Sequence, residues 1–451
     1  MPAASVSTGI ALFVHERSSD VVAYDKGRRI TAGEFLSDAA ALAERLPRRE
    51  FVLNLCANRY LFTVGLVAAM IRRQVTLLPS SQSAATLAAL GEGYSGLYVL
   101  ADRPQESAFA TVEVARTKRN VPFVVPSVPS TATALILFTS GSTGQPVPTA
   151  KTWGSLVYSA QSEALSLGLE RGSGWSILGT VPAQHSYGLE STVLLALHQG
   201  LALDGAHPFY PADVCSALDA LPRPRMLVTT PVHLRALCAM EEDLPHADLL
   251  LSATAPLATD LAEQAEAKFH GKLMEIYGCS EAGQLAFRTP VQSIPWRLMR
   301  GVRMRQDSAG TWVHGGHVPA ETLLADVIEV VDDEHFVLRG RTADLVNVAG
   351  KRTSLDYLNH QLYGIGGVED GVFFMPDSES GEARVSRLVA FVVAPGMREE
   401  DLRAALRERI DAAFMPRPIH LLEALPRNST GKIPREVLVA LAGHLRKDQE
   451  P

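Results

Sequence analysis

Short runs of β-branched and other apolar residues alternate with amphipathic stretches through the first three quarters of the chain. The short runs predict buried strands, and the stretches with a 3.6-residue period predict helices. We expect strands at Phe51–Leu55, Val75–Leu78, Ala134–Phe138, Met226–Thr229 and Leu249–Leu251. We expect helices at Ala32–Arg45, Tyr60–Arg72, Trp153–Leu167, Pro211–Ala220 and Ala258–Phe269. This alternation predicts a large N-terminal α/β domain with mixed sheets and flanking helices.

The pattern changes after about residue 315, where we expect the edge of this domain to be near. Val327–Val331 and His335–Leu338 flank a turn-like acidic tripeptide, which predicts a hairpin. Strands at Gly371–Met375 and Arg387–Val393 and a helix at Glu399–Phe414 are enough for a small, mobile α+β C-terminal domain. The predicted division is an N-terminal domain of residues 1–340, a hinge at 341–344 and a C-terminal domain of residues 345–451.

Composition narrows the class of protein. The 451 residues are 47% hydrophobic and 20% charged, with a formal net charge of −7 and no basic stripe for a nucleic acid. The four cysteines have neither disulfide-framework nor zinc-site spacing. The N-terminus does not read as a signal peptide, and the apolar stretch Tyr60–Ile71 is shorter than the ~20 residues that a bilayer requires. We therefore expect a cytoplasmic protein without a membrane span or a nucleic-acid partner.

The strongest local signal is a predicted strand, Leu135–Phe138, that runs into the loop Thr139-Ser-Gly-Ser-Thr-Gly144 ahead of a helix beginning near Thr152. Glycines allow close approach of the backbone, and bare N–H groups and hydroxyls donate to phosphate oxygens. The loop is not a GxxxxGK[ST] motif, and by itself it also fits a flexible surface loop.

Several motifs in a fixed order resemble the adenylate-forming superfamily of acyl-CoA synthetases, peptide-synthetase adenylation domains and luciferases. They are the phosphate loop at 138–144, HxxG at 185–188, SGAAPL-like Leu251–Leu257, YGxTE-like Tyr277–Glu281, GRxxD at 340–344 with Gly350 and Arg352, and NxxGK at 428–432. The family's ribose-binding acid lies 15 positions before the Arg of GRxxD, and Asp326 has that spacing from Arg341 (341 − 326 = 15).

The resemblance implies roles for individual residues. Tyr277 would stack on adenine, Ser280 would contact the α-phosphate, Asp326 would hold the ribose, and Glu281 would hold Mg²⁺, which prefers oxygen ligands. The implied ATP-binding set is Thr139, Ser140, Gly141, Ser142, Thr143, Gly144, Lys151, Ala253, Tyr277, Gly278, Ser280, Asp326 and Arg341.

Lys432, Glu281 and His185 form the implied catalytic set. The Lys432 ammonium would bridge the attacking carboxylate and the α-phosphate, and His185 would border the acyl pocket. Gly350 would enter the site for thioester formation after the C-terminal domain rotates about Ala343 and Asp344.

The sequence departs from the family pattern at three places. The phosphate loop is followed by Gln145-Pro-Val-Pro-Thr-Ala-Lys151 instead of Pro-Lys-Gly, so Lys151 either reaches the β- and γ-phosphates or is a surface residue. Ala343 stands where the family usually has Asp or Lys, and the region before the phosphate loop is short. The short region and the unusual run Pro146–Trp153 are similar to stand-alone aryl acid ligases of bacterial aryl-polyene and xanthomonadin-type pigment pathways.

The resemblance implies an acid–thiol ligase that uses ATP and Mg²⁺ to convert a carboxylic acid, expected to be aromatic, to acyl-AMP with release of pyrophosphate. The acyl group would pass to the phosphopantetheine thiol of an acyl carrier protein, or to CoA in an aryl- or fatty-acyl-CoA ligase. The enzyme would be a monomer or homodimer. Two other classes stay open, namely a non-catalytic nucleotide-binding regulatory protein and a phosphotransferase.

Overall fold

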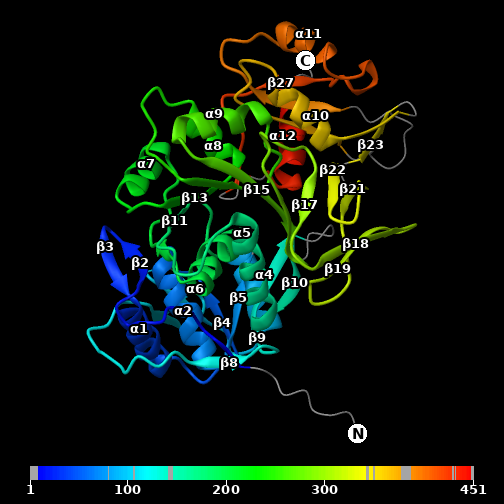
Figure 1. Cartoon of the computed structure of the whole chain (residues 1–451). Coiled ribbons are helices and arrows are strands. Elements are labelled where there is room, and N and C mark those ends of the chain that lie inside the picture. The colour runs from blue at the N-terminus through cyan, green and yellow to red at the C-terminus, as the bar shows by residue number, and fades with distance from the viewer. Residues whose placement is uncertain are drawn as a thin grey trace.

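The structure is a computed structural model that describes residues 9–79, 81–104, 107–140, 146–341, 345–348, 351–376, 388–428, 431 and 433–447. Figure 1 shows a large domain with the small C-terminal domain, in orange and red, packed on the side of α8 and α9. Within the described residues no helix is both long and apolar enough to cross a membrane. All four cysteines are described, and none forms a disulfide.

An eleven-stranded sheet runs through the large domain. Its central strands β15, β14, β13, β11 and β12 are mutually parallel, so their carboxyl ends lie along one edge of the sheet. In spatial order the strands are β21 (Asp326–Val330), β22 (His335–Arg341), β17 (Trp296–Leu298), β16 (Gly283–Arg288), β15 (Lys272–Cys279), β14 (Leu249–Ser252), β13 (Arg225–Thr229), β11 (Ser176–Gly179), β12 (Ala202–Asp204), β2 (Val21–Asp25) and β3 (Arg28–Thr31).

A second, six-stranded sheet carries the predicted phosphate loop in its edge hairpin. Its order is β10 (Pro146–Thr152), β9 (Thr133–Ser140), β5 (Val75–Leu78), β4 (Phe51–Asn54), β6 (Tyr98–Ala101) and β7 (Thr111–Glu113). Smaller sheets pair β1 (Gly9–Ala11) with β8 (Ser127–Pro129), and β18 (Val302–Asp307) with β19 (Gly310–Gly315) and β20 (Thr322–Leu323).

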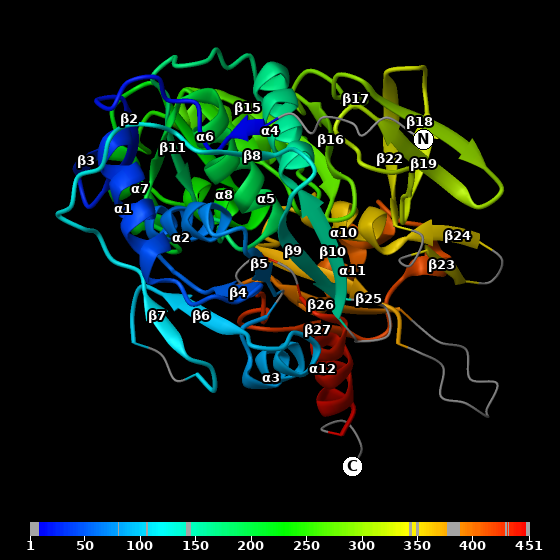
Figure 2. The same ribbon diagram turned by 90° about the horizontal axis from the view of Figure 1, so that it is seen from below.

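Alternating side chains divide the large domain into layers. Val228 and Leu251 face a core between the two sheets, whereas Leu227 and Leu250 face the outer helices, because successive side chains of a strand point to opposite faces. The inner layer holds α1 (Ala32–Arg45), α2 (Arg59–Ile71), α4 (Trp153–Leu167), α5 (Ser186–Gly188), a π-helix (Leu189–Leu194) and α6 (Leu195–Gln199). The outer layer holds α7 (Pro211–Asp219), α8 (Pro231–Cys238) and α9 (Thr259–Phe269). Figure 2 shows α3 (Ala84–Gly93) on the outer side of the six-stranded sheet.

The small domain has its own cores. One face of its sheet packs on α10 (Leu355–Tyr363) and α11 (Glu399–Arg407), and the other face packs on α12 (Arg435–Lys447). Its strands are β23 (Leu345–Val348) and β24 (Lys351–Ser354), which form a separate pair, and β25 (Asp370–Phe374), β26 (Val389–Val393) and β27 (Ile419–Leu421). The predicted fold class, a large α/β domain followed by a small α+β domain, is therefore confirmed.

The predicted strands and helices occur within three residues of their expected bounds, with one correction, and one strand was not predicted. The unpredicted strand is β10, which pairs with β9 along seven residues ahead of α4, and α4 begins at Trp153, where the sequence placed the start of the helix. The predicted helix Glu399–Phe414 ends at Arg407, since the Asp411 side chain caps a separate 3₁₀ turn, Ala412–Phe414. The predicted hairpin occurs as β21 and β22, and it belongs to the large sheet, where Phe336 pairs with Trp296. Arg387 lies outside the described residues.

Candidate active site

Three segments with predicted functional residues meet at one edge of the large sheet. The parallel strands β11, β13, β14 and β15 all end there, so the residues that follow them are brought together. The segment with His185 follows β11, Ala253 follows β14, and Ser280 and Glu281 follow β15. The Tyr187 hydroxyl donates to the carbonyl oxygen of Leu251 at 2.8 Å, which ties the first segment to the end of β14.

Tyr277 and Asp326 are in direct contact. The Tyr277 hydroxyl donates to Oδ2 of Asp326 at 2.6 Å, and its ring packs against Trp296 and Phe336 at centroid distances of 5.8 and 5.6 Å. Asp326 begins β21 opposite Arg341, so the register of the β21–β22 hairpin fixes its position. The structure thus brings together the residues that the resemblance assigns to adenine and ribose, although they are 49 positions apart.

The turn after β15 is tightly built. A Cβ atom at Gly278 would lie 2.3 Å from the carbonyl oxygen of Gly283, so only glycine fits between β15 and β16 here. Ser280 is half-buried and Glu281 is exposed. The Glu281 carboxylate is therefore accessible while the backbone beneath it is confined.

Lys151 supports this turn from below. Its side chain is 3% exposed, and Nζ donates to the carbonyl oxygen of Glu281 at 2.9 Å. Burial lowers the pKa of Lys151, and the nearby charges of Glu190 and Glu281 oppose that shift. The alternative that Lys151 is a surface residue is wrong. Pro146 is the first described residue after the phosphate loop, and the Cα atom of Lys151 lies about 16 Å from it along β10, since a strand rises ~3.3 Å per residue.

A buried polar layer lies under the turn. Glu190, in the π-helix, accepts hydrogen bonds from the hydroxyls of Ser159 and Ser186 at 2.7 and 2.8 Å. Glu163 on α4 is fully buried beside Ser191, and burial followed by the charge of Glu190 raises its pKa to about 8. Glu163 is therefore neutral over most of the range in which carboxylates are usually ionised.

The NxxGK loop of the small domain docks at the same edge. Gly431 has φ +76°, and a Cβ there would lie 3.2 Å from Cγ2 of Val232 and 3.8 Å from Oγ1 of Thr230. Thr230 directly follows β13 and caps α8 by accepting from the backbone N–H of His233. The residue before Lys432 thus contacts the large domain where the other predicted residues converge.

Several predicted residues lie outside the part of the chain that the structure describes. These are Gly141, Ser142, Thr143, Gly144, Ala343, Asp344, Gly350 and Lys432, together with the side chains of Thr139, Ser140 and Arg341. The division at residues 341–344 falls in the same region, so it stays a prediction.

Sequence reasoning missed two residues at this edge. Arg59 is buried at the start of α2, and its guanidinium donates to the carbonyl oxygens of Gly179, Val181 and Ala206 at 2.9, 2.7 and 2.6 Å. Burial lowers its pKa to about 10. An arginine heading an otherwise apolar helix was the available signal. Thr254, after Ala253, has φ +79°, which is unusual for a β-branched residue and which no sequence pattern indicated.

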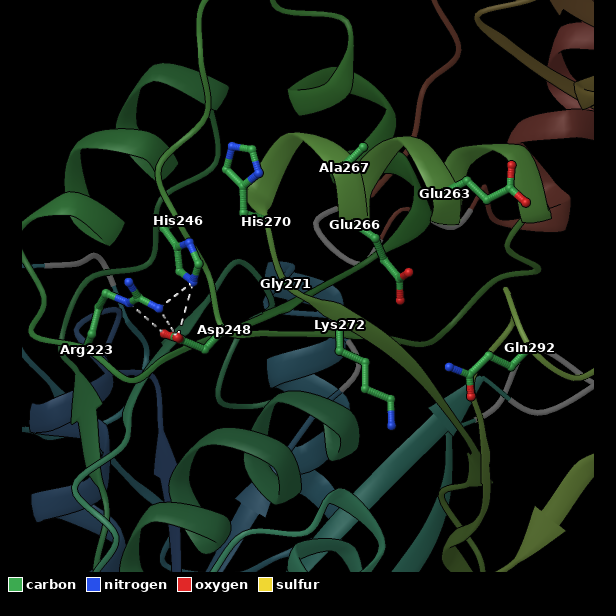
Figure 3. Close-up of a pocket in the computed structure, with 10 residues that line it drawn as sticks. All are labelled: Arg223, His246, Asp248, Glu263, Glu266, Ala267, His270, Gly271, Lys272 and Gln292. Carbon is green, nitrogen blue, oxygen red and sulfur yellow. Dashed lines mark hydrogen bonds and ion pairs between the residues drawn. The ribbon is translucent and has the colours of Figure 1, made fainter.

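An open pocket lies at the opposite edge of the parallel strands (Figure 3). Arg223, Asp248 and Lys272 lie at or just before the amino ends of β13, β14 and β15. Arg223 donates to Asp248 and approaches His246, so these charges are already paired with one another. No predicted functional residue lines this pocket, which separates it from the candidate active site.

Comparison with known proteins identifies the class. The sequence profile of the AMP-binding enzyme family matches residues 13–318, and that of the AMP-binding enzyme C-terminal domain matches residues 368–432. The chain belongs to this family of AMP-binding enzymes. It is an acid–thiol ligase that works through an acyl-AMP, which confirms the resemblance to the adenylate-forming superfamily.

Particular relatives sharpen this picture. A 4-coumarate–CoA ligase of Rhodobacter capsulatus is 31% identical over 298 residues, covering 65% of this chain and 73% of the relative. The ATP-bound MatB structure from Rhodopseudomonas palustris has a TM-score of 0.81 at 17% identity, covering 96% of this chain and 98% of that one. An o-succinylbenzoate–CoA synthetase of Bacillus subtilis, in complex with ATP and a magnesium ion, has a TM-score of 0.76 at 18% identity, covering 93% and 96%. The two structures show the fold.

Proposed function

We propose that this chain activates an aromatic carboxylic acid with ATP and transfers the acyl group to the phosphopantetheine thiol of an acyl carrier protein. The observation that carries the proposal is the convergence at one sheet edge of the Tyr277–Asp326 pair, the Glu281 turn and the loop that precedes Lys432. Nucleotide, metal and acid each require one of these groups, and all three must lie within reach of one phosphorus atom.

In the first half-reaction, a carboxylate oxygen of the acid forms a bond to the α-phosphorus, and the bond from that phosphorus to pyrophosphate breaks. Two anions must approach each other in this step, so positive charge has to be held close to both. Lys432 is proposed to place its ammonium between them, and Ser280 to donate to the α-phosphate. Tyr277 and Asp326 are proposed to hold adenosine, and their mutual hydrogen bond keeps both groups aligned before ATP binds.

Glu281 fits the proposed role of holding Mg²⁺. Its carboxylate is exposed, and its backbone is fixed by Lys151 from beneath. Within the described residues no group of three His, Cys, Asp or Glu side chains is placed to hold a metal ion. The single exposed carboxylate of Glu281 suits Mg²⁺, which proteins often bind through one carboxylate together with substrate phosphates. When bound, the ion would neutralise phosphate charge.

In the second half-reaction, the thiol sulfur forms a bond to the acyl carbonyl carbon, the carbon–oxygen bond to AMP breaks, and the thiol proton leaves with solvent or a base. The Pro146–Trp153 run favours an aryl acid and a carrier protein, through its resemblance to pigment-pathway ligases. The 4-coumarate–CoA ligase relative supports an aryl acid, but it favours CoA as the second candidate acceptor. Cytoplasmic location and a monomeric or dimeric state belong to the same proposal.

The test is acid-dependent exchange of labelled pyrophosphate into ATP across a panel of aryl and fatty acids, with and without Mg²⁺. Exchange that is highest with an aryl acid and requires Mg²⁺ is expected. The preferred acid is then supplied with ATP and either CoA or a phosphopantetheine-loaded carrier protein, and thioester is measured. Release of ADP instead of AMP, or no exchange with any acid, would overturn the proposal.

A further inference from the structure

The two domains are connected beside the candidate active site by a stacked pair. The Arg235 guanidinium, on α8 of the large domain, lies 4.2 Å from the ring centroid of Tyr363, the last residue of α10 in the small domain. Within the described residues the Arg235 side chain makes no ion pair and no hydrogen bond. Its positive charge is therefore directed at the aromatic ring, a geometry that attracts a cation.

Tyr363 is rigidly held on the small-domain side. Its hydroxyl lies 3.0 Å from Oδ1 of Asp370 and 2.8 Å from the carbonyl oxygen of Gly371, and it accepts from Nη2 of Arg427 at 2.9 Å. Burial, followed by the charge of Asp370, raises the pKa of Tyr363 to about 12. The phenol therefore stays protonated, and its ring presents a fixed face to Arg235.

Arg427 links this tyrosine to the loop of Lys432. Nε and Nη2 of Arg427 donate to both carboxylate oxygens of Asp370 at 2.8 and 2.6 Å, and Nη1 donates to the carbonyl oxygen of Gly431 at 2.6 Å. Such a bidentate pair fixes the guanidinium plane. Since Gly431 directly precedes Lys432, the Arg427 side chain connects Tyr363 by hydrogen bonds to the loop of the predicted catalytic lysine.

The same loop contacts α8 a second time, through Gly431 against Val232. Val232 and Arg235 are three positions apart on one helix, so they lie on the same face. One face of α8 thus contacts the small domain twice. Arg235 contacts Tyr363, and Val232 contacts Gly431. Rotation of the small domain away from α8 would break both interdomain contacts, the Arg235–Tyr363 stack and the packing of Gly431 on Val232.

We infer that Arg235 and Tyr363 form a latch that favours the domain orientation for acyl-AMP formation and is released for thiol transfer. The inference rests on the proposed function, because it assigns one half-reaction to the docked orientation. Arg235 is a positioning residue that acts through Tyr363 and Arg427. The latch shifts the equilibrium between domain orientations towards the docked one, and neither of its residues contacts a substrate.

The test separates the two half-reactions in Arg235→Met, which keeps an apolar stem of similar length and removes the cation. Pyrophosphate exchange with 4-coumarate, or with the acid that the panel ranks first, is expected to fall roughly 5- to 30-fold, the range of a partly desolvated cation–π contact. The KM for ATP should stay unchanged. Transfer from supplied aryl-AMP to pantetheine, a thiol common to both candidate acceptors, should stay at the wild-type rate or rise.

Two further variants of Tyr363 and one control complete the design. Tyr363→Leu should reproduce the split of Arg235→Met, and the double variant should be no worse than either single one, because both remove the same contact. Tyr363→Phe keeps the ring, so its exchange should fall less. Arg305→Met removes the guanidinium that lies 5.0 Å from the Trp312 ring in the β18–β20 sheet, and both half-reactions should be unaffected.

Wild-type exchange in Arg235→Met, an equal fall in both half-reactions, or additive losses in the double variant would overturn the latch. These outcomes differ from failure of the proposed function itself. That failure would appear as no acid-dependent exchange in the wild-type enzyme, before any variant is compared.

Discussion

The two halves of the candidate active site are held in different ways. The turn after β15 follows a strand that is paired with neighbours on both sides. The buried Lys151 ammonium donates a hydrogen bond to the backbone of this turn. The loop before Lys432 is held within the small domain by Arg427, and the described contacts that join it to the large domain near α8 are the packing of Gly431 and the Arg235–Tyr363 stack. The first half depends on the core of the large domain, whereas the second depends on a small docking surface.

This difference fits the chemistry of a two-step ligase. Groups that hold the nucleotide are needed in both half-reactions, so a rigid sheet edge suits them. The lysine proposed to act in one step only would have to arrive and leave, and weak, separable contacts would permit that movement. Substitutions on the rigid half should therefore impair both steps, and substitutions on the docking half should impair one.

The largest expected effect is that of Lys432→Ala. Loss of the ammonium should reduce pyrophosphate exchange by several orders of magnitude, because it acts on charge that develops in the transition state. Binding of ATP, measured by calorimetry, should stay nearly intact. Transfer from supplied aryl-AMP should also persist, and Lys447→Ala at the end of α12 serves as the control. Near-normal exchange would remove Lys432 from the chemistry.

The next effect is that of Lys151→Met, which leaves the Glu281 carbonyl and the nearby Glu190 carboxylate without the buried ammonium. Since the turn supports the proposed Mg²⁺ ligand, kcat should fall about 10- to 100-fold in both half-reactions, with a raised Mg²⁺ requirement. Lys268→Met is a matched control, because Lys268 donates to the carbonyl oxygen of Met240 away from this edge. A loss of activity confined to one half-reaction would contradict the interpretation that the turn after β15 serves both half-reactions.

Asp326→Ala should have a smaller effect, concentrated in binding. Removing the carboxylate takes away the proposed ribose contact and the partner of the Tyr277 hydroxyl, so the KM for ATP should rise about ten-fold. The kcat should change little, because ribose contacts are made in ground and transition states alike. Steady-state kinetics at varied ATP would show a fall in kcat alone if Asp326 instead took part in the chemistry.

The smallest effect is that of Glu163→Gln on stability. The folded-state pKa of Glu163 is raised to about 8, so the folded protein holds a proton that the unfolded chain releases above its ordinary pKa. Wild-type stability should therefore fall as pH rises towards 8, and the amide should remove that fall. We expect the variant to gain a few degrees in Tm relative to wild type at pH 8, and no gain at pH 4. An equal shift at both pH values would show that Glu163 does not titrate in this way.

Much of the fold was predictable because its signals are local. The period of apolar residues located α1, α4 and β5 at their observed bounds, and the Thr31–Glu34 capping box marks the start of α1 in the sequence itself. The β10 strand was missed because Pro146 and Pro148 argue against a strand, and an edge position tolerates them.

The sequence by itself determined the family, the order of the motifs and the spacing of Asp326 from Arg341, because each depends on residues close along the chain. The tertiary structure alone decided that Lys151 binds the carbonyl of Glu281, 130 positions away, and that Arg235 stacks on Tyr363 of the other domain. Such contacts depend on the order of strands in a sheet and on the docking of two separately formed cores. No periodicity or spacing encodes them, since the energy that fixes each pair is gained only when both segments are already in place.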